Sequence, residues 1–314
     1  MSGAAVPSYA KVRGGRWALL LAGGDGTRLR SLTRELAGDD RPKQFCRVMG
    51  GETLLEQTCR RALLSVPRAH VMTVLTEQHE RFYETLIPSM GIRHVVVQPR
   101  NRGTAPGVLY PLLRLAALAP DASVAVFPSD HHFSSDRRFA THVDTAFAAA
   151  EADPGRVVLL GIIPDTHETE YGWMEPGGSL GLPTAPTAQR VRQFWEKPEA
   201  GFAATLRERG CMWNSFVMVG MVRAFLALVR DCLPSLFAAF ATLGSPTGGG
   251  AESLAALYRC LPPSDFSRDV LAVRPERLGV IPVWGVTWSD LGSPERVRRV
   301  RRELEPRIPE LARA

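Results

Sequence analysis

Short apolar runs alternate with longer amphipathic stretches through the first half of the chain. The stretches between the runs repeat apolar residues at helical spacing, which predicts helices within residues 53–66, 105–119 and 138–152. The runs themselves are hydrophobic almost throughout, which is typical of strands in a parallel sheet covered on both faces. These predicted strands lie within residues 17–23, 70–76, 93–99, 122–130 and 156–164.

This alternation of strands and helices predicts an α/β fold with a doubly wound sheet. In such sheets, ligands bind beyond the carboxyl ends of the strands. The glycine-rich residues 23–26 and the triplet 128–130 (Pro-Ser-Asp) both follow predicted strands. We therefore expect both segments to border a ligand site.

The second half of the chain is less regular. Residues 183–189 read as a turn-rich connection, and residues 244–253 as a flexible surface loop. No internal repeat is visible. From Pro294 onward the sequence predicts a short helical tail with an unstructured end.

The composition is that of a globular protein, with 45% hydrophobic and 22% charged residues in 314. No apolar run is long enough to cross a bilayer, and the first residues lack the apolar core of a secretion signal. We therefore expect a cytoplasmic protein without a membrane partner. The five cysteines form no C-x-x-C pair, so reduced structural thiols are expected.

The net charge of +6 is compatible with nucleic acid or with a small anionic ligand. The one dense basic run, residues 295–304, alternates with Val and Leu at helical spacing, which favours a solvated amphipathic helix. Because no basic stripe interleaved with aromatic residues is present, we expect no nucleic-acid partner.

The glycine-rich segment after the first strand has two interpretations. Glycine lets backbone N–H groups approach an anion closely, so residues 23–28 (GGDGTR) are suited to phosphate. The alternative is an ordinary strand-to-helix turn, and the segment alone does not decide between them. A second cationic element, Arg41-Pro42-Lys43, follows; on its own it reads as a solvated surface loop.

Further motifs extend along most of the chain. The glycine loop and the Pro-Lys-Gln-Phe element after it (42–45) count as one motif. With the six later motifs they make seven, in order from about Leu19 to Ser293. The six later ones are QPRNRGTAP (98–106), VFPSDHHF (126–133), TEYGWMEPG (169–177), FWEKPE (194–199), MWNSF (212–216) and WSDLGS (288–293).

In this order, the motifs resemble those of the sugar-phosphate nucleotidyltransferases, and in particular of the mannose-1-phosphate guanylyltransferases (GDP-mannose pyrophosphorylases). The resemblance implies a Rossmann-like mixed sheet of the nucleotide-diphospho-sugar transferase type. It also implies a catalytic domain at residues 15–293, between a flexible extension (1–14) and the C-terminal helical tail (294–314). Because only a short tail follows the last motif, we expect neither a β-helix domain nor a fused isomerase domain.

The resemblance further implies GTP and mannose-1-phosphate as substrates, Mg²⁺ as cofactor, and roles for individual residues. Asp130 and Asp290 are expected to bind the metal. Catalysis is expected from Arg28, Lys43, Asp130, Lys197 and Asp290. Sugar-phosphate binding is expected from Gly172, Glu196, Lys197, Asn214 and Asp269. Nucleotide binding is expected from Leu21, Ala22, Gly23, Gly24, Gly26, Thr27, Arg28, Lys43, Arg102, Gly103, Thr104, Ala105 and Ser129.

Simpler readings exist for several of these residues. Asp130 is suited to capping a following helix, and Glu196 and Lys197 to forming an exposed charge pair. His131 and His132 lack a nearby third metal ligand, so local hydrogen bonds are expected for them. The assignment of Asp269 stays open because its surroundings match the family poorly.

The chain also departs from the family pattern. Arg30 and Ser31 replace Trp-Pro, Gly103 replaces an asparagine, and Phe216 replaces a glycine beside the expected sugar pocket. The same reaction with another nucleotide or sugar-1-phosphate therefore remains an alternative, as does a catalytically weak binding subunit. The oligomeric state stays open, with a homodimer as one arrangement.

Overall fold

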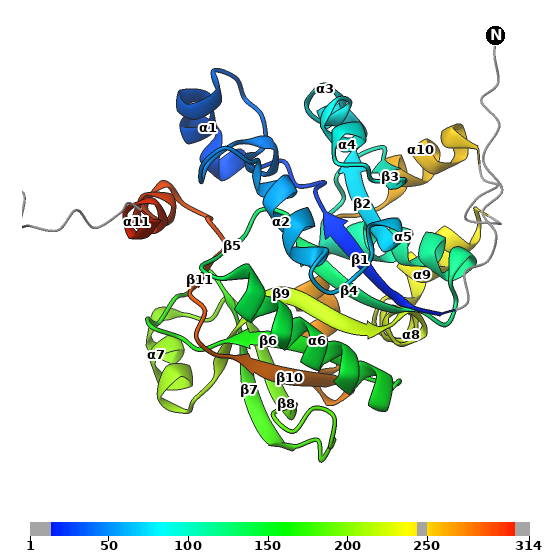
Figure 1. Cartoon of the computed structure of the whole chain (residues 1–314). Helices are drawn as coiled ribbons and strands as arrows, with labels where there is room; N and C mark the ends of the chain where they lie inside the picture. The colour runs from blue at the N-terminus through cyan, green and yellow to red at the C-terminus, as the bar shows by residue number, and fades with distance from the viewer. Residues whose placement is uncertain (1–13, 244–249, 305–314) are drawn as a thin grey trace, which may run out of the picture.

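The computed structural model describes residues 14–243 and 250–304 (Figure 1). The predicted N-terminal extension, except its last residue, therefore lies outside the described residues, as do the end of the tail and residues 244–249 of the predicted loop. The main strands are β1 (Arg16–Leu21), β2 (Val71–Thr76), β3 (His94–Gln98), β4 (Ser123–Pro128), β6 (Val157–Ile162), β7 (Gly172–Ser179), β8 (Gln189–Glu196), β9 (Met212–Met221) and β10 (Leu278–Val283).

These strands form one mixed sheet in the order β3-β2-β1-β4-β9-β6-β10-β8-β7. Strands β1 to β4 pair in parallel, as do β6 and β10. Strand β9 lies antiparallel between β4 and β6. The predicted α/β fold with a doubly wound mixed sheet is confirmed.

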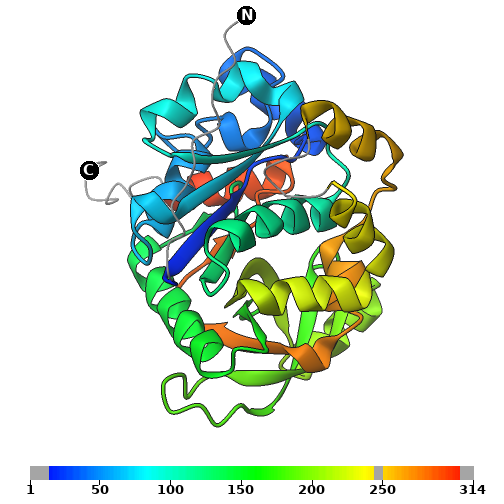
Figure 2. The ribbon, with the colours of Figure 1, turned by 90° about the vertical axis from the view of Figure 1, so that its right-hand side faces the viewer.

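Helices cover both faces of this sheet (Figure 2). Successive side chains of a strand point to opposite faces, and β1 follows this rule. Ala18 and Leu20 pack with α2 and α6, whereas Trp17 and Leu19 pack on the opposite face with α5, α8, α9 and α10. The bounds are α2 (Leu54–Ala62), α5 (Thr104–Leu118), α6 (Asp136–Ala152), α8 (Val222–Cys232), α9 (Pro234–Ala241) and α10 (Ala251–Cys260).

The first-half strands and helices match their predictions closely, because each carries its own periodic pattern. The second half corrects two expectations. Residues 251–253 begin helix α10 instead of belonging to a loop. The part read as irregular contains the paired strands β7, β8 and β9. Of the predicted turn-rich connection, residues 183–188 lie between β7 and β8, and Gln189 begins β8.

The C-terminal helix α11 (Pro294–Leu304) is present but is not a separate appendage. Its Val297 and Val300 are buried against Leu29, Leu32 and their neighbours from the start of the chain. The small helix α1 (Arg30–Ala37) thus packs near α11, beside the main sheet (Figure 1). In the described part of the chain, no single helix is long and apolar enough to cross a membrane. Helices α8 and α9 have the required length and apolar character only when taken together, and a bend of 116° separates them.

Candidate active site

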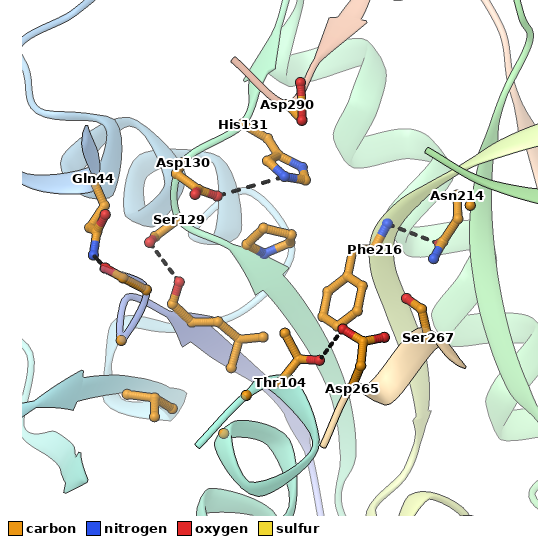
Figure 3. A pocket seen from close by; sticks show the side chains of 18 of the residues that line it. Gln44, Thr104, Ser129, Asp130, His131, Asn214, Phe216, Asp265, Ser267 and Asp290 are labelled. Carbon is orange, nitrogen blue, oxygen red and sulfur yellow. Dashed lines mark hydrogen bonds and ion pairs between the residues drawn. The ribbon is translucent and has the colours of Figure 1, made fainter. Parts of the chain in front are cut away.

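A cavity of about 390 Å³ opens beyond the carboxyl ends of β1 and β4. These strands are adjacent, with Leu21 opposite Pro128, although the chain visits β2 and β3 between them. The strand order therefore reverses here, which is where α/β sheets bind ligands. Figure 3 shows Gln44, Ser129, Asp130, His131 and Asp290 on one side of the cavity, with Asn214, Phe216, Asp265 and Ser267 on the other.

Side chains of neighbouring segments donate hydrogen bonds to the backbone carbonyl oxygens in and next to the glycine loop. The Gln44 amide donates to the carbonyl oxygens of Ala22 (3.0 Å) and Gly24 (2.7 Å). Thr76 Oγ1 donates to Gly23 O at 2.9 Å, and Ser129 Oγ to Leu21 O at 2.6 Å. With four carbonyl oxygens held in this way, the backbone enters the cavity in one conformation.

Gly24 lines the cavity, and a Cβ built on it would meet nothing within 4 Å. A side chain here would therefore clash with no part of the protein and would project into open space. Packing does not require glycine at this position. The space it leaves is available to a ligand.

A second cavity of about 290 Å³ adjoins the first, and both are lined by Asn101 and Asp130. Arg28 lines this second cavity, with 60% of its side chain exposed and Nη1 3.2 Å from Glu170 Oε2. The other residues around it are Asp25, Gly26, Thr27, Leu29, Lys43 and Gly292.

Lys43 connects the segment after the glycine loop to the segment around Asp290. Its buried Nζ donates to the carbonyl oxygens of Asp290 (2.5 Å) and Leu291 (3.2 Å) and lies 3.3 Å from Asp130 Oδ2. It is therefore not part of a solvated surface loop, which was the simpler reading of Arg41-Pro42-Lys43.

Two short strands bring the two predicted metal aspartates to one cavity. Strands β5 (His132–Phe133) and β11 (Trp288–Ser289) pair antiparallel, with Ser289 opposite His132. Asp130 and Asp290 lie at the same end of this ribbon, and both line the main cavity. Asp130 is not a helix cap, because β5 follows it and Ser135 caps α6.

The charges around Asp290 favour its ionised form. Burial by itself would raise the pKa of the Asp290 carboxyl group, but the nearby positive charges, those of Lys43 and Arg296 among them, hold it below its usual value. The carboxylate is therefore available as an anionic ligand at neutral pH.

His131 lies between Trp288, with which it forms a hydrogen bond, and Asp130. The indole Nε1 of Trp288 lies 3.3 Å from His131 Nδ1 and can only donate, so Nδ1 accepts. The ring proton then resides on Nε2, which lies 3.6 Å from Asp130 Oδ1. Burial lowers the pKa of His131, which favours this neutral tautomer.

The opposite wall is built from the antiparallel strands. Gly172 on β7, Glu196 on β8 and Asn214 on β9 all line the cavity. Burial, followed by the charge of Asp265, raises the pKa of Glu196 to about 7. Lys197 has 54% of its side chain exposed, and its Nζ lies 4.0 Å from Glu196 Oε1. Glu196 therefore lines the cavity and also forms a long ion pair with the exposed Lys197.

The segment after α10 supplies cavity residues that the sequence analysis did not identify. Asp265 and Ser267 line the cavity, and Ser267 begins a π-helix (Ser267–Leu271), an element often found at functional sites. Asp269 is instead paired with Arg268 and accepts from the backbone N–H of Asp265. No sequence motif marked Asp265 or Ser267.

Three other predicted nucleotide-binding residues do not line these two cavities. Ala22 and Ala105 are fully buried in the core. The guanidinium of Arg102 donates to the carbonyl oxygens of Tyr258 and Arg259. The remaining predicted residues of the nucleotide and sugar sets line one cavity or the other, except Lys197 and Asp269.

Gly103 stands where the family pattern has an asparagine, and this difference has a steric reason. Its φ is +91°, and a Cβ there would lie 2.2 Å from Ser264 O. Ser264 O in turn accepts from Ala105 N, so the segment preceding the π-helix packs directly onto the start of α5. Only glycine allows this contact.

The non-glycine residues with positive φ among those described all lie in predicted site motifs: Lys197 (+49°), Phe216 (+58°) and Leu291 (+49°). Such conformations cost roughly 1–3 kcal/mol each and cluster at functional sites. Phe216 therefore retains a large ring in a backbone conformation that favours glycine. Its ring packs edge-to-face on Phe266, with centroids 6.2 Å apart, while the residue lines the cavity.

Comparison with known proteins agrees with this arrangement. The model of the family described as nucleotidyl transferase matches residues 17–306, which includes α11. The chain belongs to the nucleotidyl transferase family.

Similar family members are named as mannose-1-phosphate guanylyltransferases or as proteins of polysaccharide biosynthesis. A mannose-1-phosphate guanylyltransferase from Sinorhizobium fredii is 30% identical over 282 residues, covering 87% of this chain and 52% of that protein. The xanthan biosynthesis protein XanB from Xanthomonas campestris is 30% identical over 221 residues, covering 69% and 44%. The chain thus spans about half the length of the curated relatives that it matches.

A solved structure extends the comparison to the fold. The crystal structure of mannose-1-phosphate geranyltransferase from Thermus thermophilus aligns with a TM-score of 0.76 at 31% identity, covering 88% of this chain and 76% of that one. The fold is therefore similar to that of the T. thermophilus protein over most of this chain.

The donor set of this family member restricts how a metal is held. Within residues 14–243 and 250–304, no three His, Cys, Asp or Glu side chains gather as a metal cluster. Asp130 and Asp290 offer only carboxylate oxygens to the cavity. Mg²⁺ is commonly held by one or two carboxylates, with waters and substrate phosphates completing its shell, so these residues fit that ion.

Proposed function

We propose that this protein transfers a guanylyl group from GTP to mannose-1-phosphate, giving GDP-mannose and pyrophosphate with Mg²⁺ as cofactor. The observation that carries the proposal is one cavity that combines two kinds of wall. The glycine loop, Asp130 and Asp290 form one wall, and Gly172, Glu196 and Asn214 form the other. The first suits phosphates and a metal, and the second suits sugar hydroxyls.

The reaction needs alignment and charge neutralisation rather than a general base. The attacking oxygen of a sugar-1-phosphate is already anionic, and it displaces pyrophosphate from the α-phosphorus of the triphosphate. Bringing these anions together in line is work for cations and fixed backbone dipoles. The structure offers Arg28 and Lys43 beside the glycine loop for this purpose.

We assign the roles as follows. Amides of the glycine loop and Arg28 bind the β- and γ-phosphates, while Lys43 supplies a fixed positive charge beside Asp130. Asp130 and Asp290 would hold Mg²⁺, which neutralises charge on the reacting phosphates. Lys197 binds the sugar phosphate, and Glu196, Asn214 and the Gly172 backbone bind the sugar. Asp265 and Ser267 join the sugar-side wall.

The choice of GTP and mannose-1-phosphate rests on the names of similar proteins, among them the mannose-1-phosphate guanylyltransferases of S. fredii and Escherichia coli. A second candidate keeps the reaction and changes the sugar. The Phe216 ring in the cavity wall favours it, because that ring restricts the space available.

Pyrophosphate release measured over a grid of nucleoside triphosphates and sugar-1-phosphates tests both candidates. We expect GTP with mannose-1-phosphate to give the highest kcat/KM. Preference for another pair would refute the substrate assignment and retain the reaction. Absence of turnover with every pair would refute the enzymatic proposal and favour a nucleotide-sugar-binding subunit.

A further inference from the structure

We propose that Arg296, on the C-terminal helix α11, is a positioning residue that orients the carboxylate of Asp290 toward the metal. This inference rests on the proposed function, since it assigns Asp290 to Mg²⁺. The sequence analysis had treated the basic run containing Arg296 as a solvated helix. The structure places this one arginine against the cavity instead.

The hydrogen bonds of Asp290 are distributed unequally between its two oxygens. Oδ1 accepts from three donors: Gly292 N at 2.9 Å, Arg296 Nη1 at 3.0 Å and Tyr171 Oη at 3.1 Å. Among the described residues, no hydrogen bond ends on Oδ2. The three donors therefore fix the rotation of the carboxylate and leave one oxygen as a ligand.

Arg296 is itself held rigidly. Only 11% of its side chain is exposed, and Nη2 donates to Glu168 Oε2 at 2.6 Å. Its guanidinium also lies over the Tyr171 ring, 4.5 Å from the centroid. The same tyrosine whose ring supports Arg296 thus donates its hydroxyl to Asp290.

The charge balance supports positioning rather than neutralisation. Arg296 lies between two carboxylates, so Glu168 offsets the positive charge that it brings to Asp290. A planar guanidinium can donate to both acids at once, which an ammonium group cannot do with the same geometry. The arrangement holds Asp290 in place while leaving its charge for a cation.

The backbone between Asp290 and α11 is tightly folded. Leu291 has a φ of +49°, and a Cβ on Gly292 would lie 2.3 Å from Asp290 Oδ2. The carboxylate therefore turns back over the glycine that leads into α11. Arg296, one turn into that helix, holds it there.

The test measures metal binding without turnover. Mn²⁺ is titrated into the protein with GDP-mannose present and no pyrophosphate, and free Mn²⁺ is followed by electron paramagnetic resonance. Since residues that orient metal ligands typically contribute 10–100-fold to metal affinity, we expect Arg296→Ala to weaken Mn²⁺ binding by about 10-fold or more. The Mg²⁺ concentration giving half-maximal turnover should rise in parallel, with KM for mannose-1-phosphate unchanged.

Two further variants separate positioning from folding. Arg298→Ala removes an arginine of the same helix that is 64% exposed and, among the residues that the structure describes, forms an ion pair only with Glu295, so it should leave Mn²⁺ affinity unchanged. Arg296→Lys keeps the charge but loses the two-acid contact, so its affinity should lie between those of the wild type and Arg296→Ala.

Two outcomes would overturn the inference. One is an Arg296→Ala protein that melts at a lower temperature but binds Mn²⁺ like the wild type while folded, which would assign Arg296 a structural role alone. The other is full wild-type affinity in Arg296→Lys, which would show that charge suffices. Failure of the proposed function appears separately, as a wild-type protein that turns over no substrate pair.

Discussion

The two sides of the cavity are built in different ways; we call them the phosphate side and the sugar side after the ligands that we propose for them. On the phosphate side, Gly24 and its neighbours present backbone, and side chains such as Gln44 and Ser129 fix that backbone from behind. On the sugar side, the wall consists of side chains, among them Glu196 and Asn214, that come from separate strands. One side depends on the absence of side chains and the other on their identity.

This difference predicts how each side responds to substitution. A site formed by backbone atoms tolerates no added side chain. It requires glycine at the contact and uses no side-chain chemistry. A side-chain site can exchange residues and so change which ligand it accepts. Phe216, in a glycine-like conformation, is where the sugar side departs most from the family pattern.

The largest effect is expected from Gly24→Val. The open space at this Cβ means that the side chain should not disturb folding, but it would occupy the place of a phosphate. Losing one charge-assisted hydrogen bond costs about 1.5–3 kcal/mol, so GTP affinity should fall by roughly 10–100-fold or more. Calorimetric titration with GTP, with a thermal melt, measures both properties.

Gly178→Val is the matched control, because Gly178 also has nothing within 4 Å of a built Cβ and lies on β7 outside both cavities. It should retain wild-type GTP affinity. Equal GTP affinity in Gly24→Val and the wild type would show that the loop is only a structural turn.

A smaller effect is expected when Phe216 is replaced. Both Phe216→Gly and Phe216→Ala remove the ring from the cavity wall, so each should accept bulkier sugars. We expect the kcat/KM for an N-acetylhexosamine-1-phosphate, relative to the parent hexose-1-phosphate, to rise by about tenfold. Assays of the two sugars in competition measure this ratio.

The two variants differ in backbone strain, which provides an internal check. At a φ of +58°, glycine is unstrained and alanine is not, so Phe216→Gly should be more stable than Phe216→Ala by about 1 kcal/mol. An unchanged sugar preference in both variants would remove Phe216 from the specificity of the site.

The smallest effect concerns the pH dependence of stability at Glu196. Because its pKa is raised to about 7 in the folded protein, the folded state holds a proton that the unfolded state has lost. The contribution of Glu196 to wild-type stability should therefore fall as pH rises from about 4.5 to 7. Glu196→Gln lacks this decrease, so its stability relative to the wild type should be greater at pH 8 than at pH 5, by on the order of 1 kcal/mol.

Urea unfolding of both proteins at the two pH values tests this expectation. Parallel curves, with the same difference at pH 5 and pH 8, would show that Glu196 ionises normally. A difference between pH 5 and pH 8 would assign the pH effect to Glu196 on the sugar side.

The sequence predicts the phosphate side well because its features are local. A continuous apolar run ending in glycine determines both the strand β1 and the loop after it. A second continuous apolar run forms β4 and leads into the triplet Pro128-Ser129-Asp130. Parallel pairing of β4 with β1 then brings this triplet next to the glycine loop. Metal binding by Asp130 and Asp290 remains a prediction, although both residues do line one cavity.

The remaining features depend on contacts between distant segments. Strand β7 pairs with both β8 and β9. Strands β7 and β8 were not identified because they lack long apolar runs, whereas the apolar run 216–221 of β9 was overlooked. Asp265 reaches the cavity only because Gly103 lets its segment pack onto α5. Arg296 looks like any other arginine of a basic helix, and only the position of Val297 and Val300 in the small core indicates which way that helix faces.

That small core also has a consequence for folding during synthesis. Leu29 and Leu32 lie beside the glycine loop and leave the ribosome well before Val297 and Val300, which follow them by more than 260 residues in the chain. Contacts of such long sequence separation form late in folding. The phosphate side therefore cannot be completed on a nascent chain that still lacks α11, so a partly synthesised chain carries its glycine loop without the support that shapes the finished site.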